Sequence, residues 1–234
     1  SFPHNPSQQQ RLKMIPVLFE TEFWRTQYTS DDAWLPLVVP LLLWTSCWIY
    51  GRVLGKVDFS RWYTLHTVHH LGAISQASLS LWFGNNDIFN ERITILWSLS
   101  YFAIDILDCI VTGHVLYLAH AVACLVLGLG NYNIPLLREL RMNSKASFIE
   151  TSSILLYPAK QYRKPWLFLL FAVTYTCCRI VWIPCMMKQL VDHGMEYTNI
   201  IFILLSAFYV LQIHWWIKIL KILANGGEEK KKEE

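Results

Sequence analysis

The sequence predicts an all-α membrane protein, a polytopic transmembrane helical bundle or barrel with six or seven spans. Of its 234 residues, 54% are hydrophobic and only 16% are charged, whereas soluble domains average about 25% charged residues. The apolar residues gather in long runs, and about 20 consecutive apolar residues are enough to cross the hydrocarbon core of a bilayer. The chain also has 11 Trp and 11 Tyr, rings that membrane proteins place at the level of the lipid headgroups.

The span count depends on one short apolar segment. Residues 146–159 are too few for an ordinary transmembrane helix, and a broken or re-entrant segment is tolerated only where protein shields its backbone. If this segment crosses the membrane there are seven spans, and otherwise there are six. The longer runs cover approximately residues 34–54, 62–83, 93–112, 114–130, 165–187 and 198–220.

The predicted spans form one domain between two polar ends. Residues 1–33 mix charged and aromatic side chains and are expected to form an interfacial arm. Residues 34–222 hold the transmembrane domain, and residues 223–234 form a charged tail. The formal charge of +3 is modest, so no nucleic-acid partner is expected. The expected partners are membrane lipids and, as the alternative, other membrane proteins.

Ionisable residues within the spans are the most informative feature, because they are costly in a bilayer and usually mark function. His66, His69 and His70 share one face of the second span, since they are three and four residues apart. Asp105 and Asp108 likewise share a face of the third span. We expect these groups to meet in a common interior, together with Tyr101, His120, Glu150, Arg179, Gln212 and His214.

Two chemistries could use this set. In the first, His69 or His70 acts as a general base for an amine or hydroxyl that attacks an acyl thioester, and Asp105 orients the imidazole. Acyl-CoA would then be a co-substrate, and no bound cofactor is expected. In the second, the three histidines form one ligand box of a di-iron enzyme. Such a centre needs further boxes, and the other histidines are isolated in the sequence, so no metal is expected. The alternative to both is that these residues only hold the helices together.

Several short motifs occur in a particular order along the chain. They are the His-bearing segment 62–70, the aromatic and acidic segment 100–108, residues 118–120 with His120, residues 150–153 with Glu150, residues 179–180 with Arg179, and the last helix at 212–219. In this order they resemble the TLC-domain family, which includes the ceramide synthases, over roughly residues 60–222. The resemblance implies a helical barrel whose interior admits an acyl chain from the bilayer.

The sequence departs from the ceramide synthases at two places. Those enzymes carry a His-Asp-x-x-Asp segment, and the matching stretch here has Tyr101 and Phe102 before Asp105. A second His expected beside His120 is replaced by Ala121. The pattern is nearer to the smaller, non-synthase TLC proteins. It therefore implies lipid homeostasis related to acyl transfer or, as the alternative, a non-catalytic accessory or structural subunit of a larger membrane protein complex.

The C-terminal tail suggests a location. Lys231 and Lys232 are fourth and third from the end of the sequence, where a dilysine acts as a retrieval signal of endoplasmic-reticulum membrane proteins if the tail is cytosolic. The distribution of basic residues among the loops favours a cytosolic tail. We therefore expect a multi-pass protein of the endoplasmic-reticulum membrane. If the start at Ser1 reflects import into an organelle, the mitochondrial inner membrane is the alternative.

Overall fold

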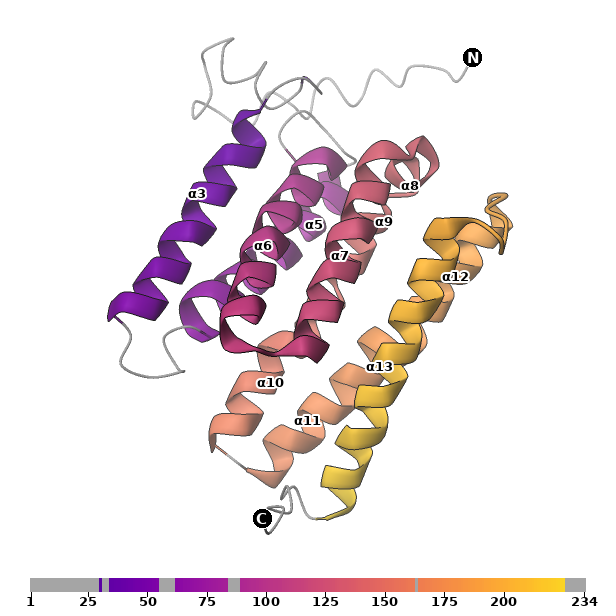
Figure 1. The fold of residues 1–234 in the computed structure, drawn as a ribbon. Helices are drawn as coiled ribbons and strands as arrows, with labels where there is room; N and C mark the ends of the chain where they lie inside the picture. Colours follow the sequence, from indigo (N-terminus) through magenta and orange to yellow (C-terminus); the bar gives the residue numbers. More distant parts are fainter. Residues whose placement is uncertain (1–29, 31–33, 55–61, 84–88, 163, 226–234) are drawn as a thin grey trace, which may run out of the picture.

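The computed structural model describes residues 30, 34–54, 62–83, 89–162 and 164–225, and every regular element among them is helical (Figure 1). The expected interfacial arm and the tail with Lys231 and Lys232 lie almost entirely outside these residues. In chain order the elements are α3 (Leu35–Ile49), η2 (Tyr50–Leu54), η3 (Trp62–Thr67), α5 (Val68–Phe83), α6 (Glu91–Thr112), α7 (Val115–Asn133), α8 (Pro135–Glu139), α9 (Met142–Ser147), α10 (Glu150–Tyr162), α11 (Pro165–Tyr175), η4 (Thr176–Val181), α12 (Trp182–Asp192) and α13 (Ile200–Ala224).

Five helical stretches in the described part of the chain are long and apolar enough to cross a membrane. This confirms an all-helical, multi-pass membrane protein. The count of six or seven is not confirmed, so the sixth and seventh spans, expected from residues 62–83 and 146–159, remain predictions. The five stretches are Leu35–Arg52, Glu91–Thr112, Val115–Asn133, Pro165–Asp192 and Ile200–Ala224.

The segment from α8 to α10 contains residues 146–159, the short apolar region whose path the sequence left open. In Figure 1 it leads from the end of the bundle where α7 finishes to the opposite end, where α11 begins. It does so as three short helices, and Arg141 between α8 and α9 has a positive φ of 53°. This path brings the first residue of α10, Glu150, into the interior of the bundle.

Glu91 fixes the position of α9. This residue opens α6 after Asn90, whose side chain accepts a hydrogen bond from the Ile93 amide at 3.0 Å. The Glu91 carboxylate accepts from the backbone amides of Asn143 at 2.6 Å and Ser144 at 3.1 Å, and from the Ser144 hydroxyl. The first amides of a helix have no partner within it, so one buried carboxylate satisfies the start of α9 and ties it to α6.

The bundle packs around three main apolar clusters, with α6 at its centre. One cluster joins α8, α9, α12 and α13, a second joins α10, α11 and α13, and a third joins α3, η3 and α6. Of the apolar window of α6, 61% is buried within the protein, compared with 6% for α7. The exposed apolar side chains of the outer helices suit a lipid environment, which leaves the interior for the polar residues.

Candidate functional site

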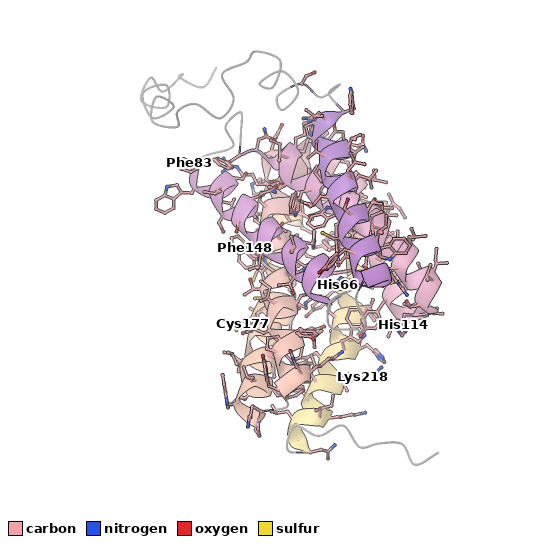
Figure 2. The ribbon with its side chains drawn as sticks, turned by 90° about the vertical axis from the view of Figure 1, so that its left-hand side faces the viewer. His66, Phe83, His114, Phe148, Cys177 and Lys218 are labelled. Atoms are coloured by element: carbon pink, nitrogen blue, oxygen red, sulfur yellow. The ribbon has the colours of Figure 1, made fainter. Side chains whose placement is uncertain are left out.

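The three histidines of the second helix face the interior of the bundle. His66, His69 and His70 are 8%, 1% and 8% exposed, and Figure 2 shows His66 near the middle of the bundle. The helix is π-helical through Thr67 and α-helical from Val68. Because the three imidazoles are buried, each needs a charged or hydrogen-bonding partner within the protein.

Glu150 is the carboxylate that contacts the His69–His70 pair. Its Oε2 lies 3.0 Å from His70 Nδ1 and 3.7 Å from Arg179 Nη2. The Ser153 hydroxyl donates to the same oxygen at 2.8 Å. A cation and a hydroxyl donor both favour the ionised form, so Glu150 is a carboxylate and His70 donates its Nδ1–H to it.

This assignment determines the tautomer of His69. The Nδ1 atoms of His69 and His70 are 3.3 Å apart, and His70 Nδ1, which already carries the proton donated to Glu150, has no lone pair to accept a proton from His69. His69 Nδ1 is then an acceptor, and its single proton lies on Nε2. That nitrogen faces Ser98 Oγ on α6 at 3.4 Å.

Asp105 lies beside His66 rather than beside the His69–His70 pair. The shortest distance, from His66 Nδ1 to Asp105 Oδ1, is 4.0 Å. Tyr101 separates the two histidine groups: its hydroxyl hydrogen-bonds to His66 Nδ1 at 2.5 Å, and its ring stacks on His69 with centroids 3.6 Å apart. The expectation that Asp105 orients His69 or His70 therefore differs from the observed geometry, in which Glu150 occupies that position.

Arg179 connects three helical elements around Glu150. It is 5% exposed and lies in the π-helical segment η4 between α11 and α12. It donates to the hydroxyls of Ser152 and Ser153 on α10 and to Gln212 Oε1 on α13, at 2.7 to 2.8 Å. The Tyr175 hydroxyl also donates to Gln212 Oε1, at 3.0 Å. A buried guanidinium needs such partners, and together they hold Glu150 in place.

A cavity of about 110 Å³ adjoins this network. His69, Ser98 and Glu150 form a polar wall, contributed by α5, α6 and α10. The rest of the lining is mostly apolar and comes from α7, α12 and α13, while Asn143 and Ser147 of α9 add further polar groups. The cavity is smaller than the engineered apolar cavity of about 150 Å³ that holds benzene, so it accommodates only a short part of an acyl chain. The residues of the apolar wall include Leu127, Gly128, Met186, Leu190, Ile201, Leu205 and Phe208.

Three further predicted site residues belong neither to this network nor to the lining of the cavity. Asp108 accepts hydrogen bonds from Trp48 Nε1 at 2.9 Å and from Arg52 Nη2 at 2.7 Å, so it ties α6 to α3 and η2. His120 contacts Cys124 Sγ at 3.6 Å and stacks on Phe208. His214 is exposed on α13. The interior is therefore more restricted than the sequence indicates.

Ser98 was absent from the predicted site residues, although it lines the cavity. A signal was present, because positions 98, 101, 102 and 105 fall on one face of a helix. Among the described residues, no group of three or more His, Cys, Asp or Glu side chains is arranged to hold a metal ion.

The fold and the site together define a class of protein: a polytopic helical membrane protein with a buried imidazole–carboxylate network beside a largely apolar cavity. A family model described as the TLC domain matches residues 61–221, which span the network and the cavity. The chain belongs to the TLC-domain family, whose members are generally lipid-related. Searches of curated proteins and of solved structures gave no significant match.

Proposed function

We propose that this protein handles lipids by binding part of an acyl chain in the cavity and the adjoining polar group at the wall of His69 and Glu150. The observation that carries the proposal is the uneven lining of the cavity, since His69 and Glu150 contribute an imidazole and a carboxylate to a lining that is otherwise mostly apolar. Ligand pockets commonly combine apolar walls with a few convergent polar groups. The bilayer supplies acyl lipids on every side of the bundle.

Acyl transfer is the reaction that this arrangement would support, with acyl-CoA as the co-substrate. His69 and Glu150 are the residues of the predicted set that line the cavity, and Arg179 and His70 keep Glu150 ionised and fixed. Tyr101 and Asp105 act on the neighbouring His66 instead. In this proposal Glu150 is the group that accepts the proton of the attacking hydroxyl or amine, His69 contributes an N–H donor, and the other members of the network position these two residues.

One observation favours a second candidate, a non-catalytic lipid-binding or accessory subunit of a membrane protein complex. Tyr101 and Phe102 replace the His and first Asp of the ceramide synthase segment. Tyr101 is 3% exposed and stacks on His69, so a tight side-chain contact fills this part of the interior. Such a contact supports a structural role for the histidines that face it.

Two pairs of variants test these functions. Leu205→Trp fills the cavity from α13, whereas Ile203→Trp adds the same ring on the exposed face of that helix, where Ile203 is 49% exposed. We expect the first variant alone to lose acyl lipids that copurify with the protein, measured by mass spectrometry. If both variants retain the same lipids, the cavity does not bind them and the proposal fails.

The second pair separates catalysis from binding. His69→Ala removes the imidazole at the cavity, and His214→Ala removes an exposed one on α13. In cells that lack the native gene, acyl transfer predicts that wild type and His214→Ala restore an altered acyl-lipid pool and that His69→Ala does not. Restoration by His69→Ala, with its lipid still bound, would instead support the non-catalytic candidate.

We also propose an endoplasmic-reticulum location, supported by Lys231 and Lys232 in the tail. Replacing both by serine should move a tagged protein out of that membrane if the dilysine acts as a retrieval signal. Colocalisation with a mitochondrial inner-membrane marker would favour the alternative location and, with it, the accessory-subunit function.

A further inference from the structure

Ser98 and Ser100 of α6 are two residues apart, which places them on different faces of the helix, and they have different hydrogen-bond partners. Ser100 donates back to the Leu96 carbonyl at 2.7 Å and is also 3.0 Å from the Leu37 carbonyl. Serine hydroxyls in helices commonly bond in this way to the preceding turn. Ser98 has no such backbone bond among the described residues, and its one recorded partner is His69 Nε2 at 3.4 Å.

The tautomer of His69 determines what Ser98 can offer. Because His69 carries its proton on Nε2, the imidazole donates to Ser98 Oγ, and the serine hydrogen remains available for another acceptor. Ser98 lines the cavity, so that hydrogen can be directed at a ligand. The network Glu150–His70–His69 thus ends in a hydroxyl donor on the cavity wall.

We propose that Ser98 donates a hydrogen bond to the carbonyl oxygen of a neutral acyl lipid, an ester or an amide, and so selects the ligand of the cavity. This inference rests on the proposed function and names the ligand class. A carbonyl oxygen is the acceptor that an acyl chain carries at its polar end. Arg179 is already paired with the Glu150 carboxylate on the same wall, so it is not a free cation that could balance the charge of an anionic ligand such as a free fatty acid.

The apolar wall gives the chain a direction to follow. Cys124, Leu127, Gly128 and Asn131 of α7 all line the cavity, and their spacing of three, four and seven residues places them on one helix face. Seven residues of α-helix span about 10 Å. The first part of an acyl chain can therefore lie along α7 while its carbonyl oxygen faces Ser98.

The experiment compares two photoreactive, alkyne-tagged probes with the same chain, a palmitate methyl ester and the matching hexadecyl methyl ether, on purified full-length protein in lipid nanodiscs. The wild type should bind the ester about fivefold more tightly than the ether, the effect of one hydrogen bond. Ser98→Ala should remove this preference, and Ser98→Cys, which keeps a weak donor, should reduce it. Ser100→Ala is the matched control on the same helix and should keep it.

The outcomes separate this inference from the proposed function. If Leu205→Trp blocks both probes but Ser98→Ala keeps the ester preference, the carbonyl contact is wrong and lipid binding in the cavity stands. If Leu205→Trp changes the labelling by neither probe, the proposed function itself fails. Equal labelling by a photoreactive palmitate anion and by the ester would overturn the selection for neutral acyl lipids.

Discussion

Helices α6 and α7 are neighbours with the same mean hydropathy of 1.6, yet 61% of the apolar window of α6 is buried within the protein and only 6% of that of α7. The polar residues make the difference. Buried Glu91, Ser100, Tyr101, Asp105 and Asp108 all belong to α6, whereas the buried residues of α7 are Ala121 and Gly128. Hydropathy therefore identifies a span, and polar residues within the span indicate which face points into the protein.

The largest expected difference in stability is between substitutions at the start of α6 and at the end of α7. Glu91→Leu, at the start of α6, leaves the buried amides of Asn143 and Ser144 without their acceptor. Each buried unsatisfied group costs about 1–3 kcal/mol, so the loss of two should lower stability by roughly 2–6 kcal/mol. Asn133→Leu, at the end of α7, removes only an exposed bond to the Leu129 carbonyl. Unfolding in detergent should show a much smaller change for the second variant.

A smaller effect is expected for apolar truncations in the two helices. Ile95 of α6 is fully buried, and Leu129 of α7 is 46% exposed. Ile95→Ala should cost about 1–3 kcal/mol, below the usual range for a buried residue, because the unfolded side chain stays in an apolar environment. Leu129→Ala should cost well under 1 kcal/mol, since lipid replaces the lost atoms. Equal losses in thermal unfolding would mean that α7 also packs against protein.

The smallest effect is expected for Tyr101→Phe. The variant loses the hydroxyl that bonds His66 Nδ1 but keeps the ring stacked on His69. Stability should fall by about 1 kcal/mol, while lipid binding in the cavity should persist because Tyr101 does not line it. Loss of lipid binding in this variant would show that the two histidine groups act as one unit.

The sequence predicts the positions of the helices well and their contacts less well. The predicted spans 93–112, 165–187 and 198–220 agree with α6, α11 to α12 and α13 within a few residues, because long apolar runs are a strong signal. The partner of His70 was harder to predict. Asp105 is nearer in the sequence, but the path through α8 and α9 brings Glu150, 80 residues from His70, to within 3.0 Å. That path follows from the bond between Glu91 and α9, which no local pattern reveals.

The sequence also does not predict which of the isolated polar residues face the site. His120 and His214 are similar when read locally, but one stacks on Phe208 and the other is exposed. Ser98 and Ser100 differ in the same way, since only Ser98 adjoins His69. In each pair the rotation of a helix about its own axis decides the role, and that rotation is set by packing against distant parts of the chain.

The π-helical segment at Thr176–Val181 sets the rotation of α12 relative to α11. A π-type turn accommodates an additional residue in an otherwise α-helical stretch. Successive residues of an α-helix are rotated by about 100° around the helix axis, so one additional residue changes which side chains of the following helix face the cavity. A one-residue deletion there would restore regular α-helix and swing Met186 and Leu190 away from the space they now enclose. Natural length variation should therefore be rare within this segment and better tolerated in the turn between α12 and α13.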